Sequence, residues 1–180
     1  VRTAELAALF AVARRDANEA LANELAVLCE NAGVDYFEAF KLLIPDVHES
    51  FAPVIAAEED RKEAYLLLEN AENLNTKLKL TALARQINEG MVRHVVNLAH
   101  DALRSCGKTL RRARVAVLGA VGPKTTTETL VKLLEAKGAK ISIYDSLSGK
   151  TEASEMAHVS KRNLTEAAEG ADCLVVLTEH

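Results

Sequence analysis

Apolar side chains recur at steps of three and four residues over most of residues 3–107. That repeat is typical of an α-helix that buries one face. It predicts helices over residues 3–31, 35–44 and 56–73 and a longer one over 75–107. At ~1.5 Å per residue the last helix would be roughly 45–50 Å long. We therefore expect it to span two parts of the protein or to form a subunit interface.

The ends of the predicted helices carry residues that start or stop helices. Gly107 favours a left-handed C-terminal cap for the longest one. Asp35 and Glu38 have the spacing of a capping box, which opens the second helix. Asn75 or Thr76 is expected to cap the start of the longest helix.

The pattern changes at Arg111. Short apolar runs predict strands over 115–118, 140–144 and 173–177. Helical stretches lie between them, and a β-α-β-α-β order implies parallel strands joined by right-handed crossovers. We therefore predict an α plus α/β fold, with a helical domain over residues 1–110 and a partial Rossmann-like sheet over 111–180.

Composition narrows the class of protein. Apolar residues make up 49 % and charged residues 27 % of the chain, as in soluble globular proteins. The formal net charge of −4 argues against a nucleic-acid partner, and no apolar run approaches the ~20 residues that cross a bilayer. No signal peptide is visible. Cys29, Cys106 and Cys173 are expected to be reduced cytoplasmic thiols. Both ends look cut, so we expect a piece of a longer protein.

Candidate chemistry lies in the turn after the first predicted strand. Gly119, Gly122 and Lys124 precede a predicted helix, where a phosphate can meet backbone N–H groups. Asp145 ends the second strand, where Rossmann units place an acid on a ribose hydroxyl. An ordinary glycine turn and a capping acid are the alternatives, because the pattern is neither GxGxxG nor a Walker A loop. We take these four residues as candidate substrate-binding residues. No residue is predicted to be catalytic, cofactor-binding or metal-binding.

Several stretches, taken together, are more specific. Residues 22–34 read ANELAVLCENAGV, residues 84–91 read ARQINEGM and residues 171–180 read ADCLVVLTEH. With 115–119 and 141–145, they resemble the UDP-glucose/GDP-mannose dehydrogenase family in order and spacing. In that family an N-terminal Rossmann domain binds NAD, a central helical domain forms the dimer and a C-terminal domain binds the nucleotide sugar. The resemblance implies the central domain and part of the nucleotide-sugar-binding domain here.

The resemblance does not extend to the family's chemistry, which oxidises the sugar C6 hydroxyl twice through a thiohemiacetal on a cysteine. Where the family has an oxyanion-stabilising lysine and asparagine, this chain has Ala8 and Val12. Residues 51–60 lack the glycines and the cysteine of the nucleophile segment. Losing one oxyanion donor typically costs ~10²–10³ in rate. Without the nucleophile no covalent route remains.

Three functions stay open. The chain could be a fragment or degenerate member that acts in dimerisation and binds a UDP-sugar or another nucleotide sugar without catalysis. It could belong to a divergent, active UDP-sugar dehydrogenase whose NAD domain lies outside this sequence. It could also be a structural interaction module that binds no nucleotide. We expect a homodimer, because the apolar stripes exceed what so small a domain can cover. The reduced thiols predict a cytoplasmic location.

Overall fold

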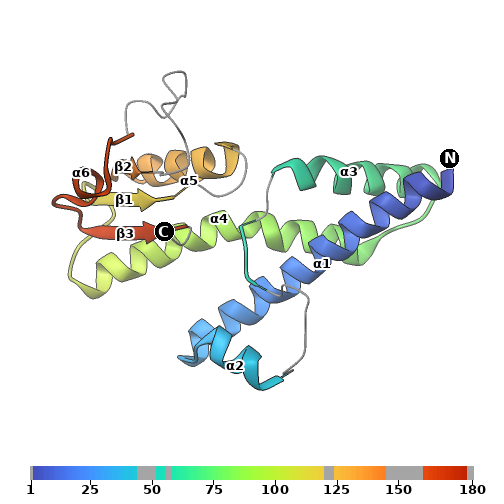
Figure 1. Cartoon of the computed structure of the whole chain (residues 1–180), viewed down its shortest axis with the longest axis horizontal. Helices are drawn as coiled ribbons and strands as arrows, with labels where there is room; N and C mark the ends of the chain where they lie inside the picture. Colours follow the sequence, from blue (N-terminus) through green and yellow to red (C-terminus); the bar gives the residue numbers. More distant parts are fainter. Residues whose placement is uncertain (1, 44–51, 56–57, 120–123, 145–159, 178–180) are drawn as a thin grey trace. The chain divides into compact units, whose positions relative to one another are not determined.

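The structure, a computed structural model, describes residues 2–43, 52–55, 58–119, 124–144 and 160–177. Within these ranges the chain forms helices and a small parallel sheet, which confirms the predicted α plus α/β class (Figure 1). No helix in these ranges is long and apolar enough to cross a membrane.

Contacts within the chain divide it into two compact units, residues 1–91 and residues 92–180. The division falls inside one long helix, α4 (Lys79–Ser105). The domain boundary predicted at residue 110 rests on the change of fold rather than on contacts, and it stays a prediction. The two units are described one at a time below.

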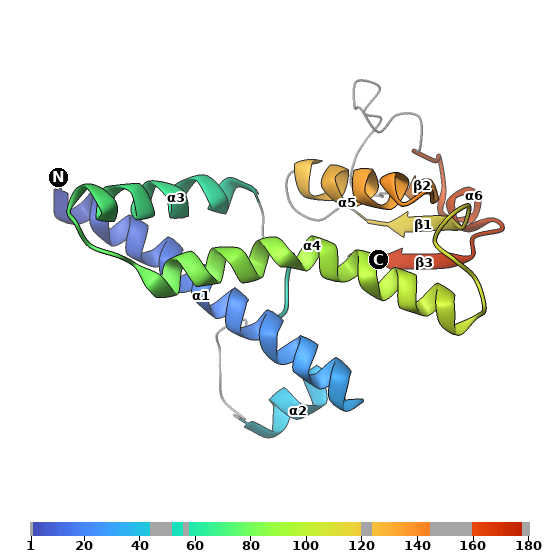
Figure 2. The same ribbon diagram turned by 180° about the vertical axis from the view of Figure 1, so that it is seen from behind.

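The first unit consists of α1 (Arg2–Ala32), α2 (Tyr36–Leu43), α3 (Glu58–Asn73) and the first part of α4. α1 packs against both α2 and α3, and Figure 2 shows α3 alongside the N-terminal half of α1. Much of the buried apolar surface here is alanine, which lets helix backbones approach closely. The buried alanines are Ala20, Ala22, Ala26, Ala64, Ala71 and Ala84.

Helix ends follow the expected cap chemistry with one exception. Gly107 has φ 70°, and Lys108 N donates to Leu103 O at 2.9 Å, which completes a Schellman motif after α4. The expectation that Asn75 or Thr76 caps the start of α4 is wrong. Asn75 has φ 53° and Thr76 N donates to Ala71 O at 2.8 Å, so these residues end α3 instead. Asparagine tolerates this left-handed conformation better than most residues, which explains the choice.

The second unit contains the parallel sheet. Its strands are β1 (Arg114–Leu118), β2 (Lys140–Tyr144) and β3 (Cys173–Val176), and α5 (Lys124–Ala136) and α6 (Leu164–Ala168) connect them. The strand order is β2-β1-β3, so β1 is central. β1 pairs with β2 from Arg114 opposite Lys140 to Leu118 opposite Tyr144. It pairs with β3 from Val115 opposite Cys173 to Leu118 opposite Val176.

β1 is buried on both faces, which explains its uninterrupted apolar sequence. Ala116 and Leu118 pack against Ala167 of α6 on one face. Ser142 of β2 secures the same helix, because its hydroxyl donates to Ala167 O at 2.6 Å. Val115 and Val117 alternate with these residues along β1, so their side chains lie on the opposite face of the sheet, where they are also buried.

Asp172 joins β3 to β1 at the start of the sheet. Arg114 N donates to Asp172 Oδ2 at 2.8 Å, and Asp172 N donates back to Arg114 O at 2.7 Å. Lys108 Nζ lies 2.6 Å from Asp172 Oδ1. The Arg114 N–H first, and then the Lys108 ammonium, lower the pKa of Asp172 because both favour the ionised carboxylate.

Asp172→Asn should lower the thermal midpoint of unfolding at neutral pH, because it removes the ion pair with Lys108. A lowered folded-state pKa stabilises the fold above the unfolded pKa of about 3.9 and loses this effect as pH falls through the folded value. The difference between wild type and variant should therefore shrink in acid. Calorimetry at several pH values measures it.

Asp101→Asn is the matched control, since Asp101 pairs with His100 on the exposed surface of α4. It should leave the midpoint almost unchanged. Equal midpoints for wild type and Asp172→Asn at neutral pH would refute the role of Asp172.

Candidate functional site

The carboxyl ends of the three strands lie at one edge of the sheet. Gly119 N donates to Tyr144 O at 2.7 Å, which ties the residue after β1 to the end of β2. Leu177 N donates to Leu118 O at 2.9 Å, which ties the residue after β3 to the end of β1. Gly119 is buried and has φ 86°, a conformation that strains any residue with a side chain. The chain therefore leaves β1 through a turn that requires glycine.

The strand order gives this edge a particular geometry. From β1 the connection through α5 leads to β2 on one side, and the connection through α6 leads back past β1 to β3 on the other side. The point between β1 and β3 is therefore a topological switch point. Open α/β sheets bind ligands outside the carboxyl ends of their strands at such points. Gly119 lies at this edge.

The structure describes two of the four predicted substrate-binding residues. Gly119 lies at the edge just described, and Lys124 is the first residue of α5. Gly122 and Asp145 lie outside the described residues. The substrate-binding role of all four stays a prediction.

All three cysteines are free thiols: Cys29 lies on α1, Cys106 in the turn after α4 and Cys173 on β3. Burial, and to a smaller extent the neighbouring Cys106, raise the pKa of Cys173. Nucleophilic cysteines need the opposite shift, because the thiolate is the reactive form. Cys173 therefore has the character of a structural residue.

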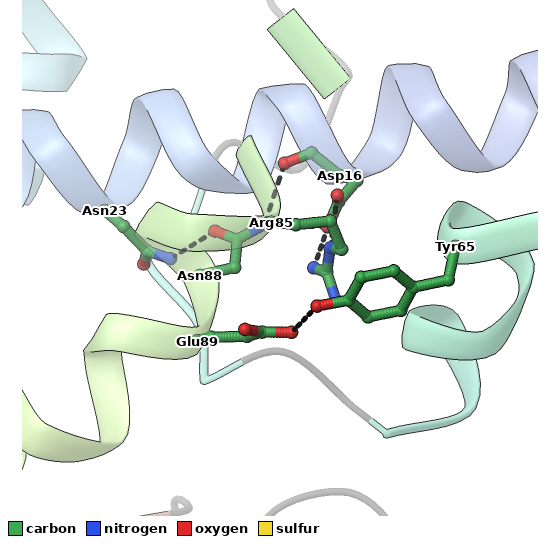
Figure 3. Close-up of polar contacts among 6 residues, drawn as sticks. All are labelled: Asp16, Asn23, Tyr65, Arg85, Asn88 and Glu89. Carbon is green, nitrogen blue, oxygen red and sulfur yellow. Dashed lines mark hydrogen bonds and ion pairs between the residues drawn. The ribbon is translucent and has the colours of Figure 1, made fainter. Parts of the chain in front are cut away.

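A second polar cluster lies in the helical unit, and sequence reasoning did not single it out as a group. It consists of Asp16 and Asn23 on α1 and Arg85 and Asn88 on α4 (Figure 3). None of these four side chains is more than 2 % exposed. Polar groups buried this deeply lower stability unless they are paired. The pairing is therefore the feature to explain.

The centre of this cluster is an ion pair. Arg85 Nε donates to Asp16 Oδ2 at 2.5 Å, and Arg85 Nη2 donates to Asp16 Oδ1. This two-pronged arrangement matches the planar guanidinium to the carboxylate. Arg85 Nη1 has no hydrogen-bond partner among the described residues. Asp16 therefore compensates for the buried charge of Arg85 almost alone.

Two asparagine amides extend the ion pair. Asn88 Nδ2 donates to the main-chain oxygen of Asp16 at 2.9 Å and to Asp16 Oδ1 at 2.8 Å. Asn23 Nδ2 donates to Asn88 Oδ1 at 2.9 Å, and Asn23 Oδ1 accepts from Val54 N at 2.9 Å. Tyr65 and Glu89 add an exposed hydrogen bond of 2.8 Å beside this cluster.

A sequence pattern on α1 indicates part of this cluster. Val12, Asp16, Ala20 and Asn23 recur at helical spacing on the buried face of α1, so two polar residues interrupt an otherwise apolar stripe. A polar residue on an apolar stripe predicts a buried partner. No local pattern identifies Arg85 as that partner, since it lies 69 residues away in the chain.

Known proteins with similar sequences support the architecture of a helical unit followed by a parallel sheet. The sequence profile described as "UDP-glucose/GDP-mannose dehydrogenase family, central domain" matches residues 2–90. The chain is 31 % identical to the UDP-N-acetyl-D-mannosamine dehydrogenase of Pyrococcus horikoshii, over 99 % of this chain and 42 % of that protein. It is 27 % identical to the UDP-N-acetyl-D-mannosamine dehydrogenase of Methanococcus maripaludis, over 99 % of this chain and 41 % of that protein.

Solved structures give the same result. An NDP-N-acetyl-D-galactosaminuronic acid dehydrogenase from Methanosarcina mazei matches with a TM-score of 0.84 at 25 % identity, over 99 % of this chain and 41 % of that one. The UDP-D-ManNAc dehydrogenase of Pyrococcus horikoshii matches with a TM-score of 0.80 at 29 % identity, over 99 % of this chain and 42 % of that one.

A helical unit followed along the chain by a small parallel α/β sheet defines an α plus α/β class of protein. Within that class, the chain belongs to the UDP-glucose/GDP-mannose dehydrogenase family, as its sequence motifs indicated. It spans about two fifths of the length of the relatives above, namely 41–42 %.

The family implies NAD as cofactor, and NAD-binding turns have a characteristic glycine spacing. The turn after β1 begins Gly119-Ala-Val-Gly122 and lacks the glycine spacing of a dinucleotide-binding turn. The residues of this turn therefore do not fit NAD.

Asp16→Ala should lower the free energy of unfolding by about 3–5 kcal/mol, because it leaves the Arg85 charge buried without its partner. Asp16→Leu combined with Arg85→Met removes both charges and should cost less than Asp16→Ala. Urea titration followed by far-ultraviolet circular dichroism measures both. Asp101→Ala on the exposed surface of α4 serves as control and should cost less than about 0.5 kcal/mol.

A double variant that is less stable than Asp16→Ala would contradict this explanation. It would mean that the ion pair itself, rather than the avoidance of an unpaired charge, stabilises the unit.

Proposed function

We propose that this chain acts in subunit assembly and nucleotide-sugar binding and performs no catalysis by itself. The observation that carries the proposal is the chemistry of α1. Ala8 and Val12 occupy the positions where the family has its oxyanion-stabilising lysine and asparagine. Ala8 is exposed and Val12 is buried one turn before Asp16. Neither side chain can donate a hydrogen bond, so neither can stabilise an oxyanion.

The missing nucleophile supports the same proposal. The described part of the segment that corresponds to the family's nucleophile region reads Ala52-Pro-Val-Ile55 and holds no cysteine. Cys29, Cys106 and Cys173 lie in other segments of the chain. A thiohemiacetal route therefore has neither the thiol nor the donors for its oxyanion.

Nucleotide binding is proposed at the carboxyl edge of the sheet. Gly119 has no side chain to obstruct a ligand, and α5 starts at Lys124, so N–H groups of a helix start follow the turn. A diphosphate has the charge that a helix N-terminus and a lysine favour. The relatives named above act on UDP- or NDP-linked sugars. A nucleoside diphosphate sugar is therefore the ligand class proposed here.

Assembly is proposed through the face of α1 that points away from the polar cluster. Phe10 and Leu28 are each 62 % exposed and Leu21 is 47 % exposed. With Leu25 they recur at helical spacing and form one apolar stripe, on the side of α1 opposite Asp16. Exposed apolar stripes of this kind mark interfaces. A second copy of the chain is the proposed partner.

One alternative has an observation in its favour. The buried ion pair between Asp16 and Arg85 and the hydrogen bonds of Asn88 to Asp16 are formed, so the helical scaffold could support a divergent active dehydrogenase. Such an enzyme would need another nucleophile and an NAD domain outside this sequence. A structural module without nucleotide binding is the remaining alternative.

Isothermal titration calorimetry with UDP should detect binding, and Lys124→Ala should weaken it about tenfold, as expected for loss of a charge-assisted hydrogen bond. Lys137→Ala, on the turn after the other end of α5, is the control.

The chain mixed with NAD, a purified NAD domain of a relative and UDP-sugars should produce no sustained rise in NADH absorbance. Sustained turnover would favour the active-enzyme alternative, and absence of UDP binding would favour the structural module.

Leu21→Asp combined with Leu25→Asp should convert a dimer into a monomer, because each places a charge in the apolar stripe. Multi-angle light scattering at micromolar concentration measures the mass. Ala8→Asp is the control, since Ala8 is exposed on the same helix but outside the stripe. A wild-type chain that is monomeric at this concentration would refute the proposed assembly.

A further inference from the structure

The polar cluster reaches beyond the helices, because it ends on a backbone N–H of the segment Ala52–Ile55. Val54 N donates to Asn23 Oδ1 at 2.9 Å, and Asn23 is fully buried at 0 % exposure. Pro53 has no N–H, so Val54 offers the first donor after Ala52. The segment is thus attached to the middle of α1 through one side chain.

The orientation of each amide follows from its neighbour. Two oxygens of Asp16 face one end of Asn88, so that end must be the donating NH₂ group. The other end of Asn88 is then its oxygen, which requires the NH₂ group of Asn23 opposite it. The oxygen of Asn23 is thereby turned to Val54 N, which is a donor. Rotating either amide by half a turn would place two donors or two acceptors face to face.

We propose that Asn88 is a positioning residue that acts through Asn23 and holds the backbone of segment 52–55 on α1. Asn88 makes no hydrogen bond to this segment among the described residues. Its effect is to orient the amide of Asn23. Without Asn88, the amide of Asn23 is free to turn its NH₂ group towards Val54 N and lose the bond.

The chemistry of asparagine explains why this residue type is needed at both positions. Its short side chain has one donating end and one accepting end. Aspartate at position 88 would offer no donor and would face the Asp16 carboxylate, which is a repulsive contact. Leucine at either position would have neither group. The proposal concerns the shape of segment 52–55, and it holds whether or not the chain is catalytic.

Amide hydrogen exchange on the full chain, followed by NMR, tests the proposal. Asn88→Ala should speed exchange at Val54 about tenfold relative to exchange at Ala71 in the same unit, the effect expected for loss of one hydrogen bond. Asn23→Ala should do the same. The double variant should add nothing, because both changes break one and the same bond. Asn31→Ala is the matched control, since Asn31 is an exposed residue of α1 whose amide donates to Val27 O.

A Val54 exchange rate that stays at the wild-type value in Asn88→Ala would overturn the proposal. Equal acceleration at Val54 and Ala71 would overturn it too, because it would indicate general loosening of the unit. A second measurement does not depend on folded variants. Scalar couplings across the hydrogen bonds of the wild-type chain should connect Val54 N with the amide carbon of Asn23, and Asn23 Nδ2 with that of Asn88. Absence of both couplings would also overturn it.

Discussion

The buried ion pair between Arg85 and Asp16 is the interaction on which the helical unit depends. Arginine stays protonated in proteins, so burying Arg85 requires an anionic partner at a fixed distance and angle. Meeting this requirement sets the rotation of α1 against the start of α4. The amides of Asn88 and Asn23 then take the only orientations that leave no buried donor opposite a donor. One charge thus sets the arrangement of three separate segments of the chain.

The sheet of the second unit depends on a different constraint, the double burial of β1. Because apolar side chains cover both of its faces, β1 takes the central place and the other two strands pair on either side of it. Asp172 secures one end of this arrangement by its bonds to Arg114. At the other end Gly119 N donates to Tyr144 O, so the glycine lies at the edge proposed for nucleotide binding.

The proposed loss of catalytic groups is compatible with an intact scaffold for a physical reason. Losing one member of the buried cluster would leave a partner without its hydrogen bond, at a cost to stability of about 1–3 kcal/mol for a neutral group. The family's lysine, asparagine and cysteine act on a substrate, and replacing such residues often leaves stability intact or improves it. The helical architecture is therefore compatible with Ala8 and Val12 whether or not the whole protein is active.

Local sequence patterns were sufficient for most of the helices and strands and for the glycine turn at Gly119, since each depends on neighbours within a few residues. Folding across long separations decided the rest. Asn75 ends α3 instead of starting α4, because Thr76 N finds Ala71 O. β3 pairs with β1 rather than β2. Arg85 meets Asp16 across 69 positions of sequence. Periodicity shows which face of an element is buried, but only the energy of pairing buried groups selects the partner.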